Sequence, residues 1–375
     1  QSHRTHHPRQ LRLTVRADAP LGPVPTTRNT TVPSPQNTGT KNSHLTLMST
    51  STAGTDTAKT TRRPLPQMLA ITFGVPVVIF LMLWAFLAPS FGSGPSGVPI
   101  AIAGPEPVQA KITSEMEQHE EHPDLISVDS SDRAKEMVQN REAVGAVVIG
   151  KGEATVYEAS GNGSPYVQML DGMAKKLEAT GAQVKTEDLA PLTEDDPQAS
   201  GISMLGLPLA FGGIISAVLS AFLLRGHKWM KLFALAGIAA LGAGLVVWML
   251  HGVYGTLDGN IFQEWLGIAL GILATSTITA GLAALIGTPG IGIGAVLTIF
   301  VGNPLSGLAT GPWLLPAGWS TLGQLMPIGS TGFLIRSISY FDGAGATRAW
   351  SVLAAWVIIG LLLLAFDRSK PKLEA

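Results

Sequence analysis

The stretch from Gly145 to Gly152 reads GAVVIGKG, and its first seven residues match G-x-x-x-x-G-K, the start of a phosphate-binding loop. Such a loop holds nucleotide phosphates with its backbone amides, and a Ser or Thr after the lysine binds Mg²⁺. Here Gly152 follows Lys151, so that hydroxyl is missing. The variable positions Ala-Val-Val-Ile favour a strand, and a second strand pattern follows instead of a helix. We therefore predict a buried strand ending in a Gly-Lys-Gly turn, and no nucleotide site.

A second run with metal-ligand chemistry is His119-Glu-Glu-His122. Two histidines three residues apart share one face of a helix, and imidazole is a common metal ligand. The run does not have the H-E-x-x-H spacing of zinc proteases, and Pro123 follows it directly. We interpret it as the solvated end of a helix, without a metal.

Two ionisable residues lie in or beside apolar segments, where such groups are often functional. Glu264 stands at the outer edge of one apolar segment, and Arg336 lies within GFLIRSISYF. The alternative roles are a capping or snorkelling carboxylate for Glu264 and an interface anchor for Arg336. We keep both as candidate transport or gating residues, and an ion pair between them is one hypothesis.

No other residues indicate catalysis. The chain has no cysteine, which excludes disulfides and thiolate chemistry. We find no catalytic triad, paired-carboxylate site or cofactor fingerprint, and we interpret the acidic run Glu194, Asp195 and Asp196 as a solvated linker. We therefore expect a protein that is not an enzyme and that has no cofactor. The net charge of −1 favours no particular partner, and we expect no nucleic acid.

The elements that must position these residues are membrane helices. The chain is 46% hydrophobic and only 14% charged, whereas soluble domains carry about 25% charged residues. A helix needs about 20 apolar residues to cross a bilayer, so membrane lipid is the expected surrounding. We predict six transmembrane helices, at 68–88, 202–224, 232–250, 262–285, 291–301 and 349–366.

Glycine and proline residues predict how two of these spans pack, begin or break. In the fourth span, Gly267 and Gly271 predict close packing against another helix. The fifth span is too short by itself, so we expect it to begin nearer Leu285 or to be broken at Pro289.

Basic residues orient the spans. Clusters precede the first span, separate the second from the third (RGHKWMK), and follow the last (DRSKPK). The positive-inside rule then places both termini in the cytoplasm of a multi-pass protein of the cell membrane. In this topology the loop with Arg225, Lys228 and Lys231 is cytoplasmic, and the segment 89–200 lies outside.

The external segment 89–200 alternates strand and helix patterns, as in a small α/β domain between the first and second spans. We predict strands at 98–104, 125–130, 143–150, 154–160 and 183–192, and helices at 107–121, 130–140 and 164–181.

The remaining segments complete a polytopic α-helical membrane protein. Residues 1–67 are expected to form a disordered cytoplasmic leader, and the true start is expected at Met48, downstream of 1–47. Residues 201–366 form a five-helix membrane domain, followed by a cytoplasmic tail at 367–375. Within that domain, the proline-rich apolar segment 302–347 predicts an outer lid with a short helix near 315–325.

This layout resembles the ABC-2-type exporter permeases, and in particular their YhgE/Pip-like actinobacterial relatives. The resemblance covers 68–366 and rests on DLAPLTEDDPQASG (188–201) and on GNPLSGLATGPWLLPAGWSTLGQLMPIGSTGFLIRSISYFDGAG (302–345). It implies a homodimeric permease that exports a hydrophobic or amphipathic substrate. It also implies a separate cytoplasmic ATPase, docked on the loop with Arg225, Lys228 and Lys231. The alternative is a non-transporting membrane protein whose external domain binds a partner or envelope component, as in phage-infection-protein relatives.

Overall fold

The computed structural model describes residues 65–91, 94, 97–118, 122–316 and 318–367. The expected start at Met48, nearly all of the leader, the tail beyond Asp367 and residues 119–121 of the His-Glu-Glu-His run lie outside these residues. Helix α1 (Leu65–Phe91) contains the first expected span and begins slightly before it.

Five strands form one mixed sheet in the order β2-β1-β3-β4-β5. Every strand lies where the sequence predicts one: β1 (Pro99–Ala103), β2 (Asp124–Val128), β3 (Gly145–Ile149), β4 (Glu153–Glu158) and β5 (Gln183–Asp188). The β3–β4 pair is antiparallel, while β1 pairs in parallel with β2 and β3, and β4 with β5. The short turn at 150–152 joins β3 to β4.

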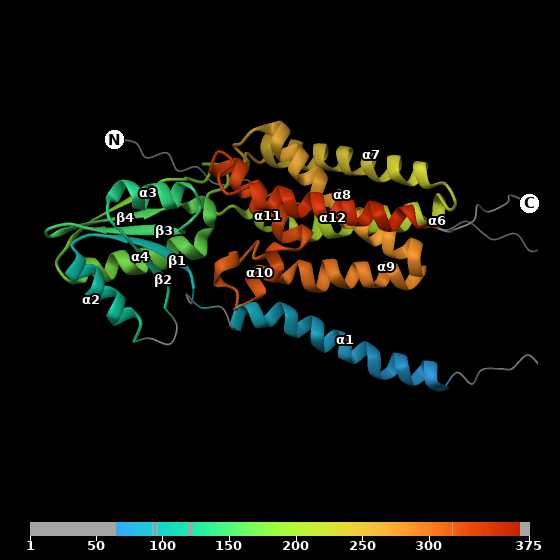
Figure 1. The fold of residues 1–375 in the computed structure, drawn as a ribbon, viewed down its shortest axis with the longest axis horizontal. Coiled ribbons are helices and arrows are strands. Elements are labelled where there is room, and N and C mark those ends of the chain that lie inside the picture. The colour runs from blue at the N-terminus through green and yellow to red at the C-terminus, as the bar shows by residue number, and fades with distance from the viewer. Residues whose placement is uncertain (1–64, 92–93, 95–96, 119–121, 317, 368–375) are drawn as a thin grey trace, which may run out of the picture. The chain divides into compact units, whose positions relative to one another are not determined.

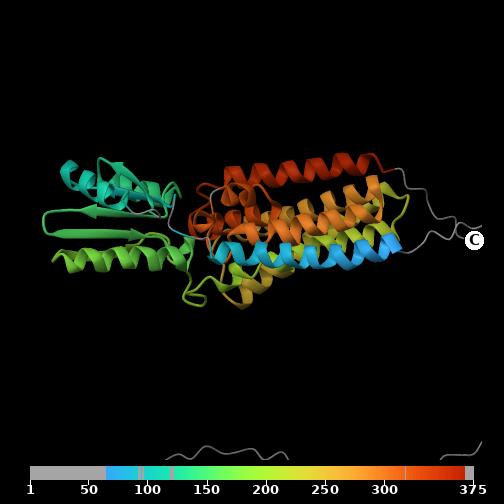
Figure 2. The ribbon, with the colours of Figure 1, turned by 90° about the horizontal axis from the view of Figure 1, so that it is seen from below.

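Helices cover both faces of this sheet (Figures 1 and 2). Successive side chains of a strand point to opposite faces. Ala101 of β1 therefore packs on the side of α3 (Ser131–Gln139), and Ile100 packs on the side of α4 (Ser164–Ala179). The helix expected at 107–121 is α2 (Glu106–Met116), which ends earlier and has no buried side chain.

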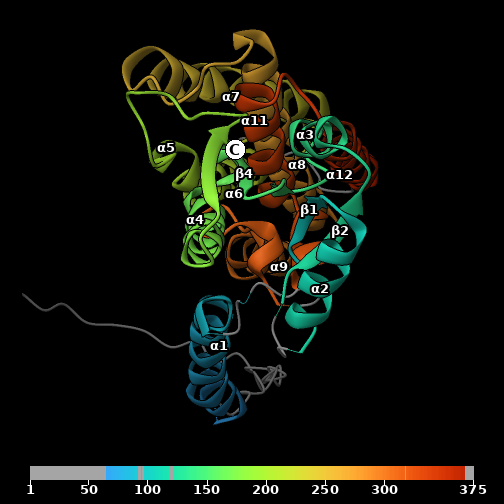
Figure 3. The same cartoon turned by 90° about the vertical axis from the view of Figure 1, so that its left-hand side faces the viewer.

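Helix α8 (Ile261–Ile286) is the central element of the helical part (Figures 1 and 3). It packs against α6 (Gly206–Leu223), α7 (Lys228–Val247), α9 (Thr288–Ala295), α11 (Pro327–Tyr340) and α12 (Thr347–Ala365). A methyl group on Gly271 would collide with Thr331 of α11. The close packing predicted for this glycine is confirmed, and it joins two helices of the same chain.

Among the described residues, four helices are long and apolar enough to cross a membrane. They are α6, α7 with a π-helical extension to Val253, α8 and α12. Two other apolar helical stretches, Thr72–Ala88 and Thr288–Gly302, are shorter. Helices long and apolar enough to span a membrane are thus confirmed at four of the predicted positions, and the total of six stays a prediction.

The fifth predicted span differs in how it begins. Gly287 ends α8 with a φ of +74°, and Pro289 lies in the first turn of α9, where its missing N–H costs nothing. The helix then continues as a π-helical turn from Val296 to Gly302. Pro289 therefore opens this helix, which begins at Thr288. Of the two alternatives, a start nearer Leu285 is confirmed and a break at Pro289 was wrong.

The segment after Gly302 contains more helix than expected. Two 3-10 turns (Pro304–Ser306 and Pro312–Leu314) precede α10 (Trp319–Gln324), which confirms the short helix predicted near 315–325. The sequence analysis missed α11, whose residues are almost all buried. Pro327 in its first turn is the signal that could have revealed it.

Candidate functional site

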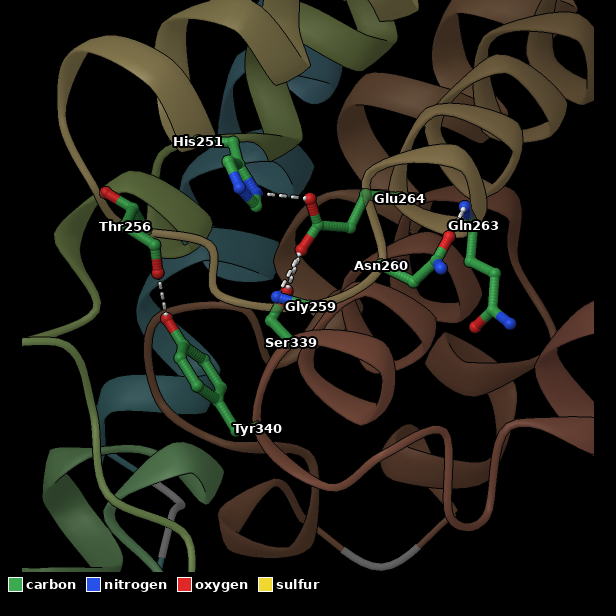
Figure 4. A network of polar contacts seen from close by, with 8 residues as sticks. All are labelled: His251, Thr256, Gly259, Asn260, Gln263, Glu264, Ser339 and Tyr340. Atoms are coloured by element: carbon green, nitrogen blue, oxygen red, sulfur yellow. Dashed lines mark hydrogen bonds and ion pairs between the residues drawn. The ribbon is translucent and has the colours of Figure 1, made fainter.

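The Glu264 carboxylate is fully buried and makes three hydrogen bonds (Figure 4). Its Oε1 accepts from the Gly259 backbone N–H at 2.9 Å and from the Ser339 hydroxyl at 2.9 Å. Its Oε2 lies 2.9 Å from His251 Nδ1. The tautomer of His251 decides which of the two groups donates in this last contact. We call these four residues the Glu264 network.

Local sequence explains how this carboxylate is held. Asn260 caps α8 by accepting a hydrogen bond from the Gln263 N–H at 3.1 Å, and Glu264 follows in the first turn. A helix N-terminus favours a negative side chain. A side chain on Gly259 would meet the Ile338 carbonyl, so only glycine lets this loop lie against α11. The capping role considered for Glu264 is therefore only part of its environment, because the carboxylate also joins α7 and α11.

The loop between α7 and α8 extends the polar contacts away from Glu264. The Tyr340 hydroxyl donates to the Thr256 carbonyl at 2.6 Å, as Figure 4 shows. The Thr256 hydroxyl donates in turn to Asp196 Oδ2 at 2.9 Å. Asp196 is buried and also accepts from the backbone amides of Ser200 and Gly201. This loop therefore lies between the Glu264 network and Asp196.

Asp196 has a different environment from the solvated linker that the sequence suggested. Burial by itself raises the pKa of Asp196, but the hydrogen bonds from Gly201, Ser200 and Thr256 outweigh it, and the pKa lies below its ordinary value. The carboxylate fixes the turn that leads into α6. The interpretation holds for Glu194 and Asp195, which are exposed, and was wrong for Asp196.

Arg336 does not pair with Glu264. It is buried and donates to two carbonyls, to Gly161 at 3.1 Å and to Leu308 at 2.9 Å. Gly161 belongs to the α/β domain, and Leu308 to the segment before α10. Arg336 thus attaches α11 to the α/β domain. The hypothesis of an ion pair with Glu264 was wrong, and the role of an interface anchor or a gating residue stays a prediction.

A second buried arginine, Arg141, also joins the α/β domain to α11, but from the α/β domain. We call the contact between the α/β domain and α11 the junction. Arg141 of the α/β domain donates to the Phe333 carbonyl at 3.0 Å and to the Ser337 hydroxyl at 2.6 Å, both on α11. Its guanidinium also lies 3.7 Å from the ring centroid of Phe333 and 4.7 Å from that of Phe341. Burial and then repulsion from Arg336 lower the pKa of Arg141 to about 9.

The sequence analysis did not select Arg141. A basic residue between a helix and a strand is typical of a solvated turn, and nothing in the sequence indicates a contact with residues almost 200 positions away. Its φ of +61° is rare for a residue other than glycine, and it directs the side chain toward α11.

The three basic residues of the expected cytoplasmic loop have different roles, and only Arg225 lies between α6 and α7, because α7 begins at Lys228. The Lys231 ammonium and the Asp367 carboxylate form a buried ion pair at 2.6 Å. Lys228 is exposed and donates to the Ala365 carbonyl at 2.9 Å. Arg225 is exposed and lines a cavity of about 290 Å³ near Thr288. Lys231 is therefore engaged within the fold and is not available for docking, which corrects one of the three expected contacts.

A larger cavity, of about 460 Å³, lies between the start of α6 and the end of α7. We call it the α6–α7 pocket. Thr256 and Asp196 contribute to its wall, so it borders the loop that leads to the Glu264 network.

Of the two motifs with possible phosphate or metal chemistry, the structure describes the first in full and only His122 of the second. The residues GAVVIGKG form strand β3 and a turn into an antiparallel strand, as predicted, with Gly150 N–H bonded to the Glu153 carbonyl at 2.8 Å. His122 Nδ1 lies 3.1 Å from the carbonyl oxygen of the neighbouring Pro123, and the rest of its motif is outside the described residues. In the part of the chain that the structure describes, no three His, Asp or Glu residues are grouped to hold a metal.

Together these features define a class: a helical, membrane-associated protein in which a small α/β domain packs on the helices through α11. Comparison with protein families, with curated proteins and with solved structures finds no match.

Proposed function

We propose that this protein is an ABC-2-like permease subunit that exports a hydrophobic or amphipathic substrate and acts with a separate ATPase. The observation that carries the proposal is the α6–α7 pocket, which is largely apolar and borders a buried polar network. Ligand sites in helical membrane proteins have this combination of apolar walls and a few placed polar groups. Membrane lipid surrounds the helices, and a homodimer is part of the proposal because the resemblance implies one.

The contacts of α11 support a link between the α/β domain and this pocket. Arg141 and Arg336 join the α/β domain to α11, whose Ser339 and Tyr340 contact the Glu264 network and the Thr256 carbonyl. Thr256 then contacts the pocket wall at Asp196. A displacement of either end would therefore be transmitted through packed groups to the other, as transport between two states requires.

The ATPase partnership predicts a defined docking loop. We expect a nucleotide-binding subunit to co-purify with the full chain in mild detergent, and the double variant Arg225→Glu, Lys228→Glu to lose it. Reversing two exposed charges at an interface lowers affinity about tenfold or more. The measurement is mass spectrometry of the purified complex. Lys151→Glu, an exposed charge reversal in the β3–β4 turn, is the control and should keep the subunit. Absence of any ATPase from the wild-type complex would refute the proposed function.

The proposed topology has both termini in the cytoplasm and the α/β domain outside. Because the chain has no cysteine, single cysteines report sidedness directly. We expect Lys151→Cys to react with an impermeant maleimide in intact cells, and Arg225→Cys to react only after the membrane is opened. Both side chains are exposed, so their reactivity depends on location. Reaction of Arg225→Cys, but not Lys151→Cys, in intact cells would reverse the orientation.

The second candidate function is a non-transporting membrane protein whose external domain binds a partner or envelope component. The observation that favours it is helix α2 of the α/β domain. This helix has no buried side chain and takes no part in the hydrogen bonds of Arg141 and Arg336 at α11. A partner bound there would leave the pocket unused, so the ATPase experiment separates the two functions.

A further inference from the structure

The chemistry of the α6–α7 pocket restricts what it can bind. Its walls are mainly apolar side chains from the start of α6 and the two residues before it, and from the end of α7 and its π-helical extension: Met204, Leu205, Pro208, Val246, Met249 and Leu250. Met204 and Met249 line the pocket and are also exposed at the surface of the helices, so the pocket is open to that surface. An occupant that exchanges with this surface must have an apolar body.

The charges of the pocket are all of one sign. Asp195 and Asp196 line it at the end nearest the α/β domain, and none of its described lining residues is Lys, Arg or His. The Asp196 carboxylate is already held by backbone amides and the Thr256 hydroxyl. The Asp195 carboxylate is exposed and makes no hydrogen bond or ion pair among the described residues. The pocket therefore has one negative group ready for a ligand.

The glycine at position 255 leaves room for the Asp195 side chain beside the pocket. Gly255 has a φ of +57°, and a side chain at this position would collide with Asp195. Tyr254, on the same turn, adds an aromatic ring to the lining, and an aromatic face attracts a cation. An acidic group and a ring beside apolar walls are complementary to a cation with a hydrophobic body.

We propose that the α6–α7 pocket binds amphipathic cations, with the apolar body between α6 and α7 and the positive centre at Asp195. The inference deepens the proposed function by naming its substrate class, and it rests on that function only where it says that the bound cation is exported. Acyl chains of neutral lipid could contact the same apolar walls without contacting the carboxylate. A test must therefore compare ligands of the same shape and different charge.

Tetraphenylphosphonium and tetraphenylborate provide this comparison, because they have nearly the same shape and opposite charges. The experiment uses the full chain in phosphatidylcholine nanodiscs, with binding measured by equilibrium dialysis and empty nanodiscs as the blank. We expect saturable binding of tetraphenylphosphonium, and binding of tetraphenylborate at least about tenfold weaker.

Asp195→Asn removes the charge and keeps the size of the side chain. We expect it to weaken tetraphenylphosphonium binding about tenfold, because it removes the only carboxylate of the pocket without an internal partner. Glu194→Gln is the matched control: this residue is exposed and adjacent but does not line the pocket, and its affinity should equal that of the wild type.

Equal binding of both probes, or an unchanged affinity for the Asp195→Asn variant, would overturn the cation inference and would indicate a neutral occupant. This outcome is distinct from failure of the proposed function. If an ATPase co-purifies and cations do not bind, the permease proposal stands without this substrate class. If cations bind and no ATPase is retained, the binding site stands and the permease proposal fails.

Discussion

Replacing Glu264 with alanine is expected to destabilise the helical part of the protein by about 3–5 kcal/mol. The carboxylate is fully buried and is hydrogen-bonded to three groups on three different segments. Without it, the half-buried Gly259 N–H and the buried Ser339 hydroxyl lose their partner, and a buried unpaired group costs about 1–3 kcal/mol. A cavity at the first turn of α8 adds to this cost. The measurement is reversible denaturation in mixed micelles.

The adjacent residue provides a stringent control for this effect. Gln263 is exposed, and only its backbone takes part in the helix cap, so Gln263→Ala should be close to the wild type. Glu264→Gln should lie between the two, because its amide oxygen can still accept from Gly259 and Ser339. Equal stability of the Glu264→Ala and Gln263→Ala variants would show that the network does not hold the helices together.

The second large effect is expected for Arg336→Ala, which should loosen the attachment of the α/β domain to α11. The guanidinium is buried and pairs with the carbonyls of Gly161 and Leu308, which lie on opposite sides of the junction. Loss of two hydrogen bonds from a charged donor, together with the space left behind, costs about 3 kcal/mol. Arg336→Lys keeps the charge but not the planar fork that reaches both carbonyls, so it should restore little.

Hydrogen exchange can locate this change. The Trp313 N–H is bonded to the Tyr166 hydroxyl at 3.0 Å across the same junction, so its exchange should become faster in the Arg336→Ala variant. The amides in the middle of α8 should keep their protection. Arg348→Ala, a change of an exposed arginine on α12, is the control and should leave Trp313 unaffected. Unchanged exchange at Trp313 in Arg336→Ala would contradict the role of Arg336 at the junction.

The local elements could be predicted because their signals are local. Alternating apolar residues predicted the five strands, and long apolar runs predicted the four helices of spanning length. GAVVIGKG was assigned to a strand and turn because its missing hydroxyl and β-branched residues are visible in the sequence. Helix α11 was missed because it is buried on nearly all sides and so has no amphipathic pattern.

The candidate site was predicted much less well, because its contacts join distant segments. Glu264 could be selected from its position in an apolar segment, but its partners His251 and Ser339 could not. Arg336 was selected for the same reason and given the wrong partner. Arg141 gave no signal at all, since its partners on α11 are remote in the sequence.

The sequence by itself thus determined the kind of protein: apolar runs of spanning length, one small α/β domain, and no cysteine or cofactor motif. Whether such a run is buried or spans a membrane depends on its apolar composition and on the period of its apolar residues. Both are visible in the sequence. Which polar groups are paired was decided by folding. An acidic run became one buried capping carboxylate, Asp196, and one exposed carboxylate at a pocket, Asp195, because α6, α7 and the loop at Thr256 meet there. A pairing of this kind depends on packing between segments that are distant in the sequence, so the neighbouring residues do not indicate it.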